Sequence, residues 1–354
     1  MASVEQLTAF TAYADRFIEK RRLNSSLFSS TPLLTVMAGK GGTDGALGRP
    51  GTGTLIGGGN ISRANQESMS GSYERHIRFL TGKVGGGKNL GARDTVPSTG
   101  NDSHDQHVRS AVFRWARHMQ PIKVWNTTVL LSKGKFEIAN AIEEATQMAM
   151  EEQMEVIHQQ LFTGNPADQT ADIWSSILGL EQCMHTTNNY GNTDRTTYTT
   201  WAGRRVTTAK TADLDLIDDA NLIQGVKNKG PGLDLAITTN AIYKKLKKQA
   251  LANGGQLLVR GMPEMKAYGQ LKEAVNYNGV TVIPDPLATS AYFYGLTLDD
   301  WLFETHSDAN WKVTPFKDQS ENPGGDDAVT AQIHLMYRLS CRKPWNQILY
   351  TNVS

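Results

Sequence analysis

The sequence contains few cysteines, no long apolar run and almost no net charge. Only Cys183 and Cys341 occur in 354 residues, far apart and without Cys-x-x-Cys spacing, which argues against a disulfide scaffold and a zinc finger. No window approaches the roughly 18 apolar residues of a membrane span, and charged residues interrupt any N-terminal signal sequence. Lys and Arg total 36 and Asp and Glu 35, which excludes a bulk polycation for nucleic acid and an acidic disordered tail.

Catalytic motifs are scarce as well. The sequence has no Gly-x-Ser-x-Gly elbow and no His-Glu-x-x-His pair. One stretch, Gly82 to Lys88 (GKVGGGK), resembles a phosphate-binding loop, but Asn89 stands where Ser or Thr would hold magnesium. The preceding segment is highly charged and no helix pattern follows, so a flexible loop tip is the favoured interpretation. A nucleotide-binding enzyme that uses this loop is kept as an alternative of another class.

Two other clusters of polar residues have simple interpretations. His104 and His107 lie in a polar segment with no element to fix metal geometry, and we interpret them as part of a solvated loop. The lysines between 244 and 248 fall on one side of a predicted helix whose apolar residues are Ile242 and Leu246. We interpret them as a solvated face, with nucleic-acid contact as the alternative.

Glycine is concentrated in one part of the chain. Residues 39–100 hold 17 of the 33 glycines, and this density leaves little apolar surface to bury. An amphipathic helix is predicted before this region, over 4–22, with no obvious local partner. The apolar side of that helix would dock on the body of this chain or on a neighbouring copy. We interpret residues 39–100 as an extended arm and loop that gain order by lying on another surface.

Two strands and a long helix follow from local patterns. Residues 73–81 and 108–115 are predicted to be strands on either side of a glycine-rich tip. Residues 135–162 are predicted to form a helix about 40 Å long, because apolar residues recur every three or four positions until Gly164 and Pro166. Residues 72–123 carry net charge +5 and residues 136–162 carry −6. A basic loop and an acidic helix are complementary, within one chain or between two copies.

The rest of the chain alternates between helix and strand patterns. A helix is predicted at 172–184, another at 213–228, a strand at 233–238 and a helix at 239–252. Further strands are predicted at 279–283 and 291–296, and a long one at 328–342 precedes a last strand at 346–353.

The order of these features resembles the major capsid protein of tailed bacteriophages, the Hong Kong 97 type fold. Gly232-Leu-Asp-Leu-Ala-Ile-Thr238 followed by a short helix is similar to the family's apical domain. Asn278-Gly-Val-Thr-Val-Ile-Pro-Asp-Pro286 is similar to its late hairpin, and Arg338 to Trp345 to its closing strand and turn. The resemblance covers almost the whole chain, and feature order carries more weight than any single motif.

The resemblance implies an α+β fold with four parts. These are an N-terminal arm at 1–59, an extended β-hairpin loop at 60–125, a peripheral domain at 126–174 and 316–354 with the long helix as its spine, and an apical α/β domain at 175–315. It also implies assembly into pentamers and hexamers that form an icosahedral shell around packaged double-stranded DNA. A virion shell protein of this kind would be synthesised in the host bacterial cytoplasm.

The resemblance implies no catalytic residue, cofactor, metal or membrane contact. The expected partners are other copies of the chain, a separate scaffolding protein, a portal, a decoration protein and, non-specifically, the packaged DNA. Two sets of residues are candidates for function, and both stay expectations here. The inter-subunit contact would use Arg75, Arg78, Lys83, Lys88, Glu143, Glu144 and Glu151, and the apical-domain turn would use Pro284, Asp285 and Pro286.

An encapsulin-type bacterial compartment shares this fold and would package cargo enzymes instead of DNA. It is the nearest alternative, and the long glycine-rich arm and loop favour the virus.

Overall fold

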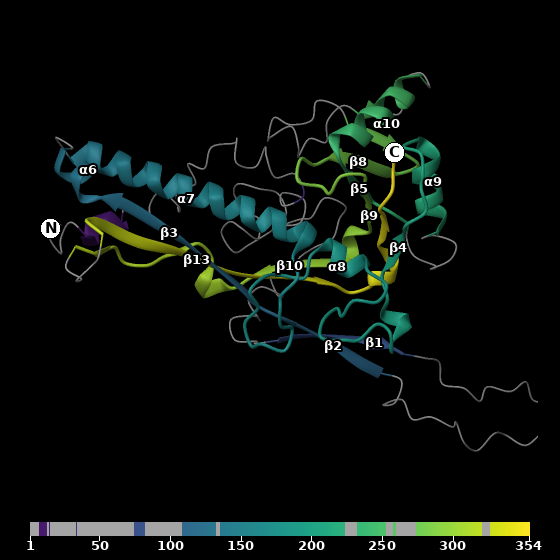
Figure 1. The fold of residues 1–354 in the computed structure, drawn as a ribbon, viewed down its shortest axis with the longest axis horizontal. Helices are drawn as coiled ribbons and strands as arrows, with labels where there is room; N and C mark the ends of the chain where they lie inside the picture. Colours follow the sequence, from purple (N-terminus) through teal and green to yellow (C-terminus); the bar gives the residue numbers. More distant parts are fainter. Residues whose placement is uncertain are drawn as a thin grey trace, which may run out of the picture.

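A computed structural model of the chain describes residues 7–12, 14, 33, 74–81, 108–131, 135–223, 232–252, 258–259, 274–320 and 326–354. The glycine-rich stretch 39–73 and the segment 82–107, which contains the phosphate-loop lookalike, lie outside the described residues. The described part is an α+β fold with one long helix, α7, and three β-sheets (Figure 1).

Helix α7 (Lys135–Thr163) confirms the predicted helix to within one residue. It follows a short helix, α6 (Asn126–Leu131), and packs along strand β3 (Ala116–Trp125) (Figure 1). A glycine is required where α7 ends, because a side chain at Gly164 would clash with the carbonyl oxygens of Gln160 and Ile177. The chain then returns so closely that Gly179 N donates to Gly164 O at 2.8 Å.

The first sheet is a two-stranded antiparallel ribbon of β1 (Glu74–Leu80) and β2 (Val108–Arg114). Both strands were predicted from their sequence, and we call this pair the β1–β2 ribbon. Alternate side chains on each strand are buried, such as Ile77 and Phe79 on β1. The ribbon is therefore fixed to the body of the protein through one face.

The second sheet is built on the long strand β13 (Ala328–Cys341). β3 pairs with one edge of it in antiparallel register over ten residues. Its other edge takes three short strands: β10 (Trp301–Thr305), β11 (Lys312–Val313) and β12 (Lys317–Asp318). Pro121 lies inside β3, opposite Gln332, which is tolerated because an edge strand can lack one backbone donor.

The third sheet has seven strands in the order β4-β14-β9-β5-β8-β7-β6. Their bounds are β4 Arg204–Val206, β5 Leu235–Thr238, β6 Leu258–Val259, β7 Ala274–Tyr277, β8 Val280–Pro284, β9 Phe293–Leu296 and β14 Ile348–Tyr350. β4 and β14 are parallel, as are β5 and β8, and the other pairs are antiparallel. The predicted strand at 279–283 is confirmed as β8. It forms a hairpin with β7, which was not predicted, and Asn278 (φ 50°) and Gly279 (φ 81°) form the tip with the left-handed conformations that such turns need.

This sheet separates two apolar cores. Side chains such as Ala236 and Val282 pack with helices α9 (Leu214–Leu222) and α10 (Asn240–Ala252). Their neighbours Ile237 and Ile283 face the other core, which contains α7 and α8 (Leu180–Met184). Because successive side chains of a strand point to opposite faces, one sheet packs on α9 and α10 with one face and on the core around α7 with the other (Figure 1).

The structure differs from one local prediction and extends another. The predicted helix at 172–184 is wrong in its first half, because Trp174 N donates to Trp115 O and pairs with β3 instead, so only α8 is helical. The predicted N-terminal helix is helical at the described residues 7–12 and 14. It docks on this chain: Phe10 packs edge-to-face on Phe316 at 6.1 Å, and Phe316 N donates to Thr11 Oγ1 at 3.1 Å.

Candidate assembly surfaces

The β1–β2 ribbon is anchored by aromatic contacts. Phe79 stacks on Trp201 with ring centroids 4.5 Å apart, and Phe113 meets Tyr190 edge-to-face at 5.1 Å. All four rings are buried. Arrangements of this kind add about 0.5–1.5 kcal/mol per pair beyond the burial of area.

A buried cluster of charged groups holds the base of the ribbon. Arg75 Nη1 donates to Glu304 Oε1 at 2.6 Å, and Arg338 Nη2 donates to Glu304 Oε2 at 2.5 Å. The side chains of Glu304 and Arg338 are each 1% exposed. Arg338 also lies 4.3 Å from the centre of the Trp115 ring, and burial lowers the pKa of its guanidinium. The cluster joins β1, β10 and β13 into one unit.

The predicted basic contact residues therefore have different surroundings. Arg75 is engaged within its own chain, whereas Arg78 is exposed on the opposite face of β1. Leu80 on that same face is 64% exposed. Lys83 and Lys88 lie outside the described residues.

The predicted acidic contact residues lie along α7. Glu144 is exposed, while Glu143 and Glu151 are partly exposed. Met148, which is 71% exposed, lies among them, and Gln147 Nε2 donates to Glu151 Oε1 at 2.9 Å. The helix thus presents a stripe that combines carboxylates with one large apolar side chain, a composition that suits contact with a basic partner.

The turn at Pro284, Asp285 and Pro286 contains a connection that the sequence did not reveal. Asp285 follows the end of β8 and is fully buried. Its Oδ2 accepts from His158 Nε2 at 2.9 Å and from Leu33 N at 3.1 Å, and its Oδ1 accepts from Leu287 N at 2.9 Å. One carboxylate therefore joins α7, a residue of the N-terminal segment and the turn itself.

The two cysteines also come together. Cys183 on α8 and Cys341 at the end of β13 are buried and free, and burial together with a hydrogen bond between the thiols raises the pKa of Cys341. Arg195 Nη2 donates to the Cys183 carbonyl at 2.8 Å, and Cys341 N donates to Tyr190 Oη at 3.1 Å. Because thiolate is the reactive form of cysteine, the raised pKa of Cys341 makes that thiol structural rather than nucleophilic.

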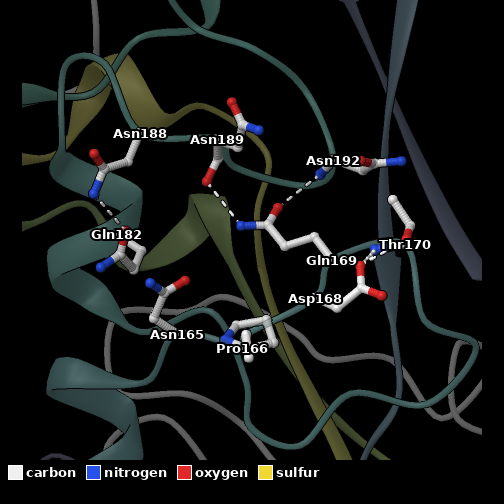
Figure 2. Close-up of a pocket in the computed structure, with 10 residues that line it drawn as sticks. Asn165, Pro166, Asp168, Gln169, Thr170, Gln182, Asn188, Asn189 and Asn192 are labelled. Carbon is white, nitrogen blue, oxygen red and sulfur yellow. Dashed lines mark hydrogen bonds between the residues drawn. The ribbon is translucent and has the colours of Figure 1, made fainter.

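A surface pocket of about 450 Å³ lies between the segment after α7 and the segment after α8 (Figure 2). Gln169 spans it, donating to Asn189 O at 3.1 Å and accepting from Asn192 N at 3.0 Å. Hydrogen bonds from Thr170 lower the pKa of Asp168 at its rim. The side chains are mostly neutral amides, and nearby Gly191 O accepts from Val112 N of β2 at 2.8 Å. We interpret the region as a support for the ribbon.

Within the described residues, no cluster of three His, Cys, Asp or Glu side chains is arranged to hold a metal ion. No helix of the described part is both long and apolar enough to cross a membrane.

The sequence matches no family model and no curated protein. Its structure, however, is similar to solved shell proteins. The capsid protein of Cyanophage A-1(L) matches with a TM-score of 0.58 and 14% identity, over 92% of this chain and 93% of that one. The encapsulin SrpI of Synechococcus elongatus PCC 7942 matches with a TM-score of 0.50 and 11% identity, over 80% of this chain and 83% of that one.

The long helix beside the β3–β13 sheet, the two-stranded ribbon and the α/β unit thus form a fold that is shared with shell-forming proteins. This is the Hong Kong 97 type α+β fold of tailed-phage major capsid proteins, and it confirms the fold expected from the sequence.

Proposed function

We propose that this chain is a major capsid protein that assembles as pentamers and hexamers into an icosahedral shell around packaged double-stranded DNA. The observation that carries the proposal is the likeness to the Cyanophage A-1(L) capsid over more than nine-tenths of both chains. A subunit of such a shell works through its contacts with neighbouring copies. The proposal therefore assigns it no catalytic residue and no cofactor.

The parts of the chain take the following roles in this proposal. Residues 1–59 are the N-terminal arm, 60–125 the extended loop, 126–174 with 316–354 the peripheral domain, and 175–315 the apical domain. Strand pairing crosses these limits in several places. β3, β10 and β11 pair with β13, and β14 pairs with β4 and β9, so the proposed domains are joined by backbone hydrogen bonds and would move as linked bodies.

The main contact between copies would place the basic β1–β2 ribbon of one subunit on the acidic stripe of α7 in the next. Arg78, Lys83 and Lys88 would supply the positive charge, and Glu143, Glu144 and Glu151 the negative charge. Arg75 would act indirectly, since it holds the ribbon base through Glu304. Such a heterologous contact forms a ring when the repeated rotation from copy to copy completes a full turn.

Further partners follow from the same proposal. A separate scaffolding protein would guide assembly, a portal would occupy one vertex, a decoration protein is a further candidate partner, and packaged DNA would be contacted without sequence preference. The protein would be made in the cytoplasm of a bacterial host and end in the virion.

An encapsulin-type compartment is the second candidate, favoured by the likeness to SrpI over 80% of this chain. A nucleotide-binding enzyme that uses Gly82–Lys88 has less support, because Asn89 stands where Ser or Thr would hold magnesium and the preceding strand, β1, belongs to a two-stranded ribbon.

Sedimentation of the purified full-length chain through a density gradient, alone and with host lysate, tests the proposal. We expect particles far larger than a hexamer, holding nuclease-protected DNA when they are isolated from infected cells. Particles that hold co-purifying protein and no nucleic acid would favour the compartment. A chain that stays monomeric or dimeric under every condition would refute both.

A further inference from the structure

The five-stranded sheet has a second face, opposite α7. Even-numbered β3 side chains such as Ile122 and Val124 are buried toward α7, and Gln120 Nε2 donates to Glu152 Oε2 on that helix at 2.6 Å. The odd-numbered residues of β3 from Arg117 to Trp125 all point the other way and are exposed. With their cross-strand partners on β13, and with Lys312 and Lys317, they form what we call the solvent face.

The solvent face is predominantly basic. Lys312 of β11 is opposite His334, and Lys317 of β12 is opposite Thr330, so both lysines share this face with Arg117 and Lys123. Their side chains are exposed. The single described carboxylate paired with these cations is Asp326, whose Oδ2 lies 2.5 Å from Lys123 Nζ. The remaining positive charge needs a negatively charged partner.

The same face contains large apolar side chains. Trp125 is 50% exposed and Met119 is 46% exposed. Exposing apolar side chains of this size to water is unfavourable in free energy. Lys123 Nζ lies 4.0 Å from the centre of the Trp125 ring, and Arg117 Nη2 lies 2.9 Å from His334 Nδ1. Trp, Met and Arg are enriched in protein–protein interfaces.

We propose that the solvent face binds an acidic surface of a separate accessory protein. This rests on the proposed shell function. The mixture of apolar side chains with cations favours a protein over DNA, because DNA interfaces depend on cations that contact phosphates. A second copy of the chain is disfavoured, because its acidic stripe lies on α7, on the far side of the same sheet (Figure 1). In the proposed shell that stripe is already covered by the β1–β2 ribbon of a neighbouring copy.

The partner would lie on the face rather than extend the sheet. β3 is an edge strand, and the backbone N–H and C=O groups that point away from β13 belong to its odd-numbered residues. Arg117 is one example, because its N–H donates to Trp174 O on that outer side. Pro121 occupies one of these positions and has no N–H to donate, and Lys123 occupies the next. Proline and lysine on an edge strand both oppose the addition of another strand.

Fluorescence anisotropy with a labelled peptide of interspersed glutamates and leucines, and with a labelled DNA duplex, tests the proposal on purified full-length protein. We expect the peptide to bind, and Lys312→Glu with Lys317→Glu to weaken it about tenfold or more. The matched control, Lys244→Glu with Lys248→Glu, makes the same charge change on exposed α10 and should bind like the unaltered chain.

The apolar contribution has its own pair of variants. Trp125→Ala should weaken peptide binding, and Leu251→Ala, which removes a similarly exposed side chain from α10, should not. The proposal is overturned if the peptide does not bind, if both charge variants lose binding equally, or if the duplex binds more tightly than the peptide and is lost with the same lysines. Because binding can be measured on unassembled protein, a chain that forms no shell would refute the proposed function and still test the face.

Discussion

Replacing Glu304 by Gln removes the negative charge at the centre of the buried cluster. Glu304 Oε1 accepts from Arg75 at 2.6 Å, and Oε2 accepts from Arg338 Nε at 2.7 Å and Nη2 at 2.5 Å. Gln has the same size, so the change leaves packing intact. It leaves two guanidinium groups close together without their carboxylate.

The two arginines should contribute unequally to the cost. Arg338 is 1% exposed and cannot regain water, whereas Arg75 is 21% exposed and can turn outward. Breaking a buried pair by removing one partner costs about 3–5 kcal/mol, so we expect Glu304→Gln to lower the free energy of unfolding by about 3 kcal/mol. Arg75→Gln should cost about 1 kcal/mol, because the Glu304–Arg338 pair survives. Glu144→Gln, on the exposed stripe of α7, is the control and should change stability by less than about 0.5 kcal/mol.

Urea unfolding of the unassembled full-length chain measures these differences, and hydrogen exchange at β1 and β2 locates them. Glu304→Gln should speed exchange in the ribbon before the rest of the molecule opens. The double variant Glu304→Leu with Arg338→Met replaces the buried pair by apolar side chains. It should be more stable than Glu304→Gln and close to the unaltered chain, because apolar replacement of a buried ion pair is often neutral. If Glu304→Gln costs no more than Glu144→Gln, the cluster does not anchor the ribbon.

Three further predictions concern other parts of the molecule. Asp285→Ala should lower the free energy of unfolding by about 3–5 kcal/mol in urea, because it removes the buried carboxylate that joins three segments, whereas Pro286→Ala beside it should cost under about 1 kcal/mol; equal effects would contradict the assigned role. Glu143→Lys with Glu151→Lys should reduce assembly, measured by sedimentation, more than it reduces the thermal stability of the monomer, and equal losses would refute the contact on α7. Burial, with neighbouring cations, lowers the pKa of His334, so around pH 6.5 the unfolded chain binds more protons than the folded one and the free energy of unfolding falls as the pH drops. His334→Gln should reduce the slope of the free energy of unfolding against pH between about pH 7.5 and 5.5. An unchanged slope would contradict a lowered pKa of His334 in the folded protein.

Local pattern was enough to predict the long elements. The helix predicted over 135–162 ends one residue later, and the strand predicted over 328–342 ends one residue earlier. Both have regular apolar spacing over many residues, and α7 also has a glycine stop. The strands β10, β11 and β12 were not predicted, because two of them have only two residues and all three exist through pairing with β13.

The supporting contacts could not be predicted from the sequence. Asp285 and His158 are 127 residues apart, and nothing in either neighbourhood marks them as partners. An aspartate between two prolines indicates a turn, and a histidine in a helix indicates nothing in particular. The meeting of Cys183 with Cys341 likewise depends on how the end of β13 packs against α8. Such contacts depend on how the chain is connected in space. The sequence indicated that topology only through its resemblance to the phage capsid proteins.

The most direct test of the central claim is cryo-electron microscopy of the purified full-length protein under assembly conditions. The account predicts closed shells built from five-fold and six-fold rings, with the β1–β2 ribbon of each subunit lying on α7 of its neighbour. Discrete monomers or dimers under all conditions would contradict the shell function. Shells in which the ribbon contacts no part of α7 would keep that function and refute the proposed contact.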